Sequence, residues 1–366
     1  MSKRRRLAIA CMGTVLALGC LYAAWGTRAW EHSPLPGTGE KRRVILRVWD
    51  VDGPTGSSAW LRGQCAEFEK HMPGLTVYLR SVPASECYVP GTVLPDVLCF
   101  ADGTFASPQQ LLVPLRDMEG VTEAFAQSGR WQTKQYALPL AAEGWMLAVG
   151  EAYLPAPAQT PAPTTLLGRA VATPQAERAA MPPLDALRKQ DIPLAARGQG
   201  LFALGIWLGV QPLPLPQEAT TQASVLTALT RGEAASALLS TGQWATLENQ
   251  MAQGQCAGFQ AWVPPEMPAP RMLYAGITET AQPEAAALLS YLIAAPAQQA
   301  LSQQRLFSVR EDVLLYFSSP WVEMERVMGA HCFPVNAFWP KERVETAARG
   351  AYQGTLELEA ALAELR

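Results

Sequence analysis

Few side chains in this sequence are arranged as covalent or acid–base catalysis would require. The three histidines, His32, His71 and His331, are scattered, and no G-x-S-x-G, H-E-x-x-H, S-x-x-K or Walker-type motif is present. A catalytic nucleophile, a metal site or a phosphate-binding loop each requires several groups at fixed spacing. The sequence therefore predicts a protein that is not an enzyme and holds no cofactor and no metal.

Aromatic and acidic side chains instead occur where they could bind a polar molecule. Trp49 and Asp50 end the first predicted strand, and strand ends of an open α/β sheet face the ligand crevice. Flat rings can stack on the faces of a sugar, and carboxylates accept strong hydrogen bonds from its hydroxyls. Asp50 also fits a turn or a helix cap. Glu143, within an apolar run, needs a partner if it is buried, and the backbone is an alternative to a ligand.

The elements that would position these residues follow a strand–helix–strand order. Residues 44–49 are rich in β-formers, and residues 61–68 carry apolar side chains at helical spacing until Pro73 and Gly74 end the helix. Residues 75–79 alternate as in a half-buried strand, and residues 96–100 form a third strand candidate. This order predicts a parallel α/β sheet. Later in the chain we expect a buried strand over 234–239 with a helix after it, and another helix from Glu284.

Length and composition limit the architecture and the partners. The 366 residues are too many for one ordinary core, so two lobes are expected. Hydrophobic residues make up 49% and charged residues 17%, as in a folded globular body. The net charge is −3 and no strongly basic domain is evident, so nucleic acid is not an expected partner.

The N-terminus carries an export or anchor signal. Four basic residues, 3–6, precede an uncharged stretch over residues 7–27, which as a helix would be long enough to cross a membrane. The basic cluster would stay in the cytoplasm and place the remainder outside. Three fates stay open: a cleaved signal peptide, an uncleaved anchor, or a lipoprotein signal, because residues 17–20 resemble a lipobox with Cys20 as the lipidation candidate. Residues 28–43 would then be a tether.

Five cysteines lie outside the export segment, and an exported protein can form disulfides. A bridge between Cys65 and Cys87 is one interpretation, because both fall near the first strand–helix–strand unit. The alternative is that all five are small buried apolar residues.

Taken in order, these segments resemble the extracellular solute-binding proteins of ABC importers, family 1, in the branch that includes maltose-binding protein. The resemblance covers nearly the whole exported body and is carried by Ala66 to Val77, Pro95 to Asp102, Tyr136 to Glu143, Arg231 to Ala245, Glu284 to Leu301, and Phe333 to Trp339. It implies an α/β, two-lobed periplasmic-binding-protein type II fold with a hinge and an interlobe cleft. Two departures are visible: residues 83–94 leave room for only a shortened helix, and Gly103 replaces a polar ligand contact.

The resemblance also implies a binding site. Trp244 and Trp339 would be stacking platforms, and Asp102 and Glu143 would accept hydroxyl hydrogens. Trp145 is equally consistent with the core, and Asp102 could instead shape a turn. The complete predicted site is Trp49, Asp50, Asp102, Glu143, Trp145, Trp244 and Trp339.

The family pattern divides the body into two lobes. Residues 44–138 and 275–309 would form the first lobe, and residues 139–274 and 310–366 the second. The lobes would be joined by crossing segments near residues 138–142, 274–280 and 308–312, and would close around a ligand that touches both.

The function implied is that of an extracytoplasmic solute-binding component of an ABC importer, tethered in the periplasm or at the cell surface. It would capture a small polar ligand, a mono- or oligosaccharide, and dock on permease subunits in the membrane. A membrane-anchored sensor or adaptor with altered or lost ligand binding is the alternative. An exported glycan hydrolase, with two carboxylates in a sugar cleft, is a third reading.

Overall fold

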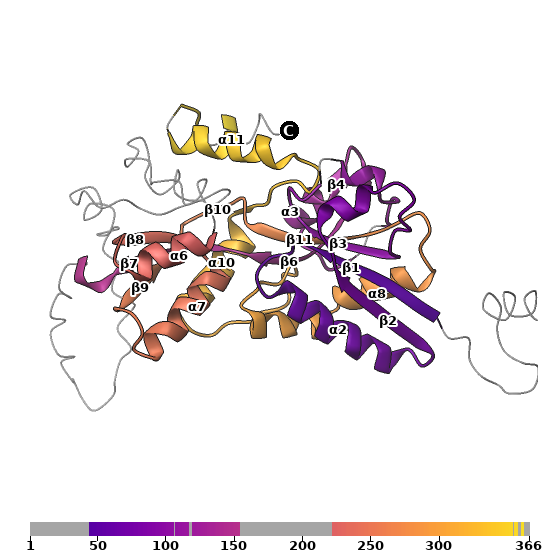
Figure 1. Cartoon of the computed structure of the whole chain (residues 1–366), viewed down its shortest axis with the longest axis horizontal. Helices are drawn as coiled ribbons and strands as arrows, with labels where there is room; N and C mark the ends of the chain where they lie inside the picture. The colour runs from indigo at the N-terminus through magenta and orange to yellow at the C-terminus, as the bar shows by residue number, and fades with distance from the viewer. Residues whose placement is uncertain are drawn as a thin grey trace, which may run out of the picture.

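The computed structural model describes residues 44–105, 107–116, 119–153, 222–353, 355–357 and 360–361. Figure 1 shows two parts side by side along the long axis, each built around one sheet. The first sheet has the order β2-β1-β3-β11-β6 and the second the order β8-β7-β9. We call the part around the first sheet the first lobe and the part around the second sheet the second lobe.

The first three strands of the first lobe confirm the predicted parallel sheet. Their bounds are β1 (Val44–Val51), β2 (Leu75–Ser81) and β3 (Val97–Ala101), and β1 pairs in parallel with both of the others. Helix α2 (Ser57–His71) forms the crossover from β1 to β2 and buries its apolar stripe, Leu61, Cys65 and Phe68. The helix ends just before Pro73, as the sequence predicts.

Two further strands complete the first sheet and lead to the second lobe. Strand β11 (Arg271–Ile277) runs antiparallel to β3 and to β6 (Leu138–Glu143). After β6, only Gly144 intervenes before β7 (Trp145–Gly150), which belongs to the second sheet. A Cβ atom at Gly144 would lie 2.7 Å from the sulfur of Met324, so a side chain at this change of sheet would require Met324 to move.

The second lobe is an antiparallel sheet with helices. Strand β7 pairs with β8 (Ser236–Ser240) on one side and with β9 (Phe259–Trp262) on the other. The buried strand and following helix predicted near residue 234 are confirmed as β8 and α7 (Thr241–Ala252). Helices α6 (Gln222–Thr230) and α10 (Trp321–Ala330) lie in the same part of the molecule (Figure 1).

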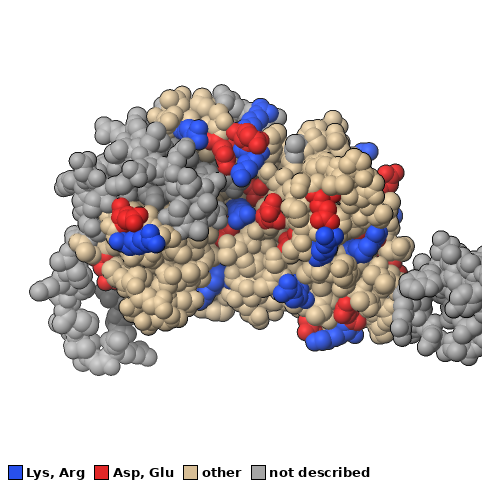
Figure 2. Space-filling model, in the orientation of Figure 1, with Lys and Arg blue, Asp and Glu red and all other residues tan. Residues whose placement is uncertain are grey.

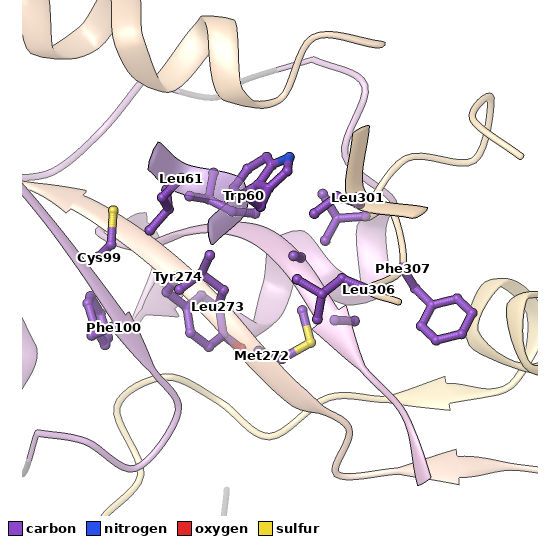
Figure 3. Packing of buried hydrophobic residues seen from close by; sticks show 14 of the residues in the cluster. Trp60, Leu61, Cys99, Phe100, Met272, Leu273, Tyr274, Leu301, Leu306 and Phe307 are labelled. Carbon is purple, nitrogen blue, oxygen red and sulfur yellow. The ribbon is translucent and has the colours of Figure 1, made fainter. Parts of the chain in front are cut away.

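A continuous core fills the first lobe and extends into the second. Helix α8 (Glu284–Leu292), predicted from its apolar face, α9 (Ala295–Gln299) and η4 (Ala300–Gln304) pack beside α2. Figure 3 shows side chains of α2, β3, β11 and the segment after η4 meeting in this core. The indole N–H of Trp60 donates to the carbonyl of Ala297 at 3.0 Å, which fixes α2 against α9.

Eight further elements occur among the described residues. They are η2 (Pro108–Gln110), α3 (Glu123–Ser128), β4 (Arg130–Trp131), β5 (Lys134–Gln135), η3 (Glu151–Tyr153), β10 (Met267–Pro268), β12 (Cys332–Phe333) and α11 (Lys341–Tyr352). The phenol O–H of Tyr274 on β11 lies 2.7 Å from the Ser128 hydroxyl and 2.9 Å from the Val335 carbonyl oxygen. These contacts connect the segment before α11 to the first lobe.

The connection from β2 to β3 is short. It contains only a single 3₁₀ turn, η1 (Ala84–Tyr88), so the expected shortening of the helix here is confirmed. At the outer edge of the same sheet, the Glu69 carboxylate accepts the Val77 N–H of β2 at 2.5 Å.

The cysteines of the described residues are free. Cys65, Cys87, Cys99 and Cys332 are buried, and Cys256 is partly exposed. The predicted Cys65–Cys87 bridge is therefore wrong, and four of the five thiols behave as small core residues. Burial raises the pKa of Cys65 to about 12 and, with the charge of Glu86, that of Cys87 to about 11, so both thiols are protonated at neutral pH.

Residues 1–43, which include Cys20 and the predicted anchor and tether, lie outside the described residues. Within the part of the chain that the structure describes, no helix has the length and hydrophobicity to cross a membrane.

Candidate functional site

The two lobes meet where the loop after β1 approaches the first turn of α7. A Cβ atom built on Gly242 would lie 2.6 Å from the Cβ of Thr55 and 3.0 Å from a carboxylate oxygen of Glu143. Only glycine allows the helix to come this close to the loop. The helix itself starts with a capping box, in which Ser240 and Gln243 bond each other's backbone N–H groups.

Glu143 lies at the centre of this boundary. It is fully buried at the end of β6, and its Oε1 accepts the N–H of Gly242 at 3.3 Å. Its Oε2 lies 3.8 Å from Nη1 of Arg271, the residue opposite it on β11. Arg271 also donates to the carbonyl of Asp52 at 3.0 Å. The carboxylate thus complements the positive end of α7, and Arg271 extends the contact to the loop after β1.

Asp50 forms the other acidic group of the boundary. One of its carboxylate oxygens accepts a short hydrogen bond from the Ser58 hydroxyl. Burial raises the pKa of the Asp50 carboxyl, and the bond from Ser58 partly offsets this rise. A Cβ atom on Gly53 would lie 2.2 Å from the Ser57 hydroxyl and 3.1 Å from the other Asp50 oxygen, so these two polar groups face the same small space.

Several polar atoms on the elements that meet at this boundary are buried without a hydrogen-bond partner among the described residues. They are Asp50 Oδ1, Ser57 Oγ, Glu143 Oε2, Thr241 Oγ1 and Trp244 Nε1. Buried polar groups are almost always satisfied, because an unpaired one costs about 1–3 kcal/mol. The set contains acceptors (two carboxylate oxygens), a donor (the indole N–H) and two hydroxyls that can do either. It is chemically suited to a ligand that carries hydroxyl groups.

The structure brings Asp50 and Glu143 to this boundary, places Trp244 in the first turn of α7, and gives Trp49 and Asp102 contacts within the first lobe. Trp49 is buried on β1 with the guanidinium of Arg80 6.0 Å from its ring. Asp102 is buried just after β3 and accepts the Met272 N–H at 2.7 Å. Gly103, next to it, has a φ of +71° and a Cβ there would lie 3.2 Å from the Cβ of Lys341. The glycine at this position accommodates the start of α11.

The remaining indoles belong to different parts of the molecule. Trp145 is buried on β7 and donates its N–H to the carbonyl of Ala269 at 3.1 Å. Trp244 is buried in the main core, whereas Trp339 is partly buried against a separate cluster formed with α11. The stacking role of these rings stays a prediction.

Sequence reasoning missed Ser57, Thr241 and Arg271. The pattern Ser240-x-x-Gln243 marks a helix start and could have directed attention to Thr241. Nothing local identifies Arg271, because its place is set by the pairing of β11 with β6. Figure 2 shows acidic and basic side chains in the middle of the displayed face, between the two parts. No group of metal-ligating side chains occurs among the residues that the structure covers.

Comparison by sequence finds no match: no protein-family model fits the chain, and no curated protein sequence matches it. Comparison of the fold finds similar solved structures. The GacH receptor of Streptomyces glaucescens, solved unliganded and with acarbose, matches with a TM-score of 0.58 and 15% identity, over 89% of this chain and 97% of that one.

Two further solved structures are similar. Maltose-bound MalE3 of T. maritima has a TM-score of 0.57 and 15% identity, over 88% of this chain and 98% of that one. A cyclo/maltodextrin-binding protein with bound maltotetraose has a TM-score of 0.57 and 14% identity, over 90% and 98%. The chain therefore has the two-lobed periplasmic-binding-protein fold that these maltose- and maltodextrin-binding proteins share.

Proposed function

We propose that this protein is an extracytoplasmic solute-binding component of an ABC importer that captures a mono- or oligosaccharide between its lobes. One observation carries the proposal: five buried polar atoms that have no hydrogen-bond partner among the described residues lie on elements that meet at the boundary between the lobes. They come from the end of β1, the start of α2, the end of β6 and the first turn of α7. A ligand that reaches both sides would hold the lobes together.

The solved structures of the same fold support a carbohydrate as the ligand. Their bound molecules are acarbose, maltose and maltotetraose. Each offers many hydroxyls, which match the carboxylate oxygens of Asp50 and Glu143 and the hydroxyls of Ser57 and Thr241. We place the body outside the cytoplasmic membrane, tethered through residues 1–43 by a lipid on Cys20 or by an uncleaved helix. Permease subunits would be its partners there.

No chemical step is needed for this function. The residues of the boundary bind and orient, and the protein is proposed to be a binding protein without catalysis. Capture would proceed by contact with one lobe followed by closure of the other, because ligand stabilises a closed form only by its extra contacts there.

Thermal stability with and without sugars tests the proposal. The melting temperature of the full chain should rise with a sugar of the right class, since a ligand specific for the folded state stabilises it. Thr241→Val removes one unpaired hydroxyl at the boundary. It should stabilise the unliganded protein by up to about 1–3 kcal/mol and reduce the shift that sugar produces.

Ser236→Ala is the matched control. Ser236 also has a buried hydroxyl without a partner among the described residues, but it lies at the start of β8, at the far end from the boundary. The Ser236→Ala substitution should stabilise the unliganded protein and leave the sugar-induced rise in melting temperature unchanged. If no mono- or oligosaccharide raises the melting temperature of the unaltered chain, the proposed carbohydrate function is overturned.

A sensor or adaptor without ligand is the second candidate, and one observation favours it. The boundary is tightly packed, with Thr55 against Gly242 and six of the seven predicted ligand residues buried. A protein held in this form by its own contacts would present one surface permanently. Unchanged stability with all sugars, combined with an unchanged radius of gyration, is the result expected of an adaptor.

A further inference from the structure

One side of the first lobe carries a group of exposed apolar side chains. We call it the β1–β2 face. Its members, with their exposed fractions, are Ile45 (62%), Tyr78 (57%), Tyr88 (48%), Val89 (53%) and Val93 (64%). Single exposed apolar residues are ordinary, but several on one side of a lobe mark an interaction surface.

The strand register explains why these residues share a side. Side chains alternate along a strand, and paired residues of parallel strands point the same way. Leu46 and Val77 are paired and face the core under α2, so Ile45 and Tyr78, one position along, point to the opposite side. The β2–β3 connection lies on that side as well, because Glu86 of η1 forms an ion pair of 2.7 Å with Arg80 of β2.

The short β2–β3 connection leaves the β1–β2 face without a covering helix. A full crossover helix would cover the first halves of β1 and β2, whereas η1 spans only Ala84–Tyr88. The charges nearest the face are already paired: Arg47 with Asp96 and Arg80 with Glu86. Ile45 and Tyr78 lie on the same side of the sheet as these paired charges.

The position of the chain's first residues indicates what covers the face. β1 begins at Val44, directly after Lys41-Arg42-Arg43 and next to Ile45. The uncharged stretch of residues 7–27 ends 16 residues before β1, and 16 residues span at most ~55 Å. If that stretch is in the membrane, the connection to it enters the body next to Ile45, at the edge of the β1–β2 face.

We propose that the β1–β2 face rests on the surface of an anionic bilayer. The inference depends on the membrane tether in the proposed function and goes beyond it by assigning a docking surface. Basic residues 41–43 are attracted to anionic headgroups, and tyrosine and aliphatic side chains are favourable at the headgroup boundary. The second lobe and the boundary between the lobes would then remain free to take up ligand and meet a permease.

Hydrogen exchange on vesicle-bound protein tests the proposal. The full chain is placed in vesicles of phosphatidylcholine alone, or of phosphatidylcholine with phosphatidylglycerol, and flotation measures association. In floated protein, backbone exchange over residues 75–95 should be slower with the anionic lipid than with the neutral one, and high salt should abolish the difference.

Variants locate the effect. Ile45→Ser with Tyr78→Ser should lose the protection while the protein still floats. Leu314→Ser with Phe317→Ser, at positions exposed by 71% and 90% elsewhere on the chain, should keep it. Val89→Ser with Val93→Ser, placed outside the regular strands, serves as a second test if the strand variant does not fold.

Each other outcome contradicts the proposal. Equal exchange in the two vesicle types overturns docking and leaves the tether intact. Failure to float overturns both the tether and the docking, and leaves sugar binding, which is measured separately by melting, unaffected. Protection that appears in detergent and grows with protein concentration would assign the face to a second copy of the chain.

Discussion

Burial removes water from the Asp50 carboxyl and so disfavours its charged form. The hydrogen bond from the Ser58 hydroxyl replaces only part of the lost hydration. The raised pKa means that the folded state binds the proton more tightly than the unfolded state does. At pH values above the pKa that Asp50 has in the folded protein, its charge therefore lowers the free energy of unfolding. This loss disappears as the pH falls towards the lower pKa that Asp50 has in the unfolded chain. A charge kept at such a cost is typical of a functional site.

Asp50→Asn tests this directly. The amide carries no charge and can still accept the Ser58 hydrogen bond, so the free energy of unfolding at neutral pH should rise by about 0.5–2 kcal/mol. The gain should shrink as the pH is lowered through the folded pKa, and the sugar-induced shift should fall. Urea unfolding at several pH values measures the first two effects.

Asp312→Asn is the matched control for that substitution. Asp312 is exposed and paired with Arg310 at 2.6 Å, which lowers the pKa of its carboxyl. Its small contribution to stability is present above the unfolded pKa and is lost as the pH falls through the folded pKa. If Asp312→Asn stabilised the protein as much as Asp50→Asn, burial would not be the cause of the effect at Asp50.

At the residue level, the sequence predicted two of the residues that the structure places at the boundary. Asp50 and Glu143 could be chosen because a strand end and an acidic residue in an apolar run are visible locally. Arg271 and Thr55 could not, because their contacts with Glu143 and Gly242 depend on how distant segments pair and pack.

Helix α7 shows how one element can set the distance between lobes. Its first turn has no side chain at Gly242, and Thr55 occupies the space that a Cβ would need. The contact is possible only in the form of the molecule where the lobes are close together.

Gly242→Ala should push the loop after β1 away from α7. We expect a larger radius of gyration in small-angle X-ray scattering and a loss of about 1–3 kcal/mol in the free energy of unfolding, as for other overpacked sites. Gly63→Ala in α2 is the control, since nothing lies within 4 Å of its Cβ. It should stabilise the protein by about 0.4–1 kcal/mol without a change in size. Identical radii for the two variants would contradict the proposed role of the contact.

Regular elements were the predictable part of the fold. Helices α2 and α8 and strands β1, β2, β3 and β8 have clear periodicity and start or stop signals. The two-residue strands β10 and β12 carry no such pattern, because their pairing comes from the packing of the surrounding chain. The predicted lobe boundaries stay predictions, although the strands place the change of sheet at Gly144.

Among the described residues, the largest cluster of buried side chains crosses from lobe to lobe. Phe100 and Leu273 of the first sheet and Leu147 and Leu239 of the second belong to the same cluster of buried residues. We expect the lobes to unfold together, in a single calorimetric transition whose van't Hoff and calorimetric enthalpies agree. Two separate transitions, only one of them moved by sugar, would show that the lobes are energetically independent.

At this scale the order of segments was informative although the sequence has diverged far. Identities of 14–15% to the similar structures leave few matched residues, yet the fold matches over 88–90% of this chain. The order of segments does not specify a ligand, because ligands are recognised by individual side chains rather than by the framework.

The carboxylate of Glu69 has a consequence for how the protein behaves at high concentration. It occupies a backbone donor in the middle of β2, the outermost strand of its sheet. A neighbouring molecule that tried to add its own strand there would have to displace a charged acceptor and then bury it. The edge strand β2 is therefore protected against pairing with strands of other molecules, which would lead to fibrous or domain-swapped assemblies.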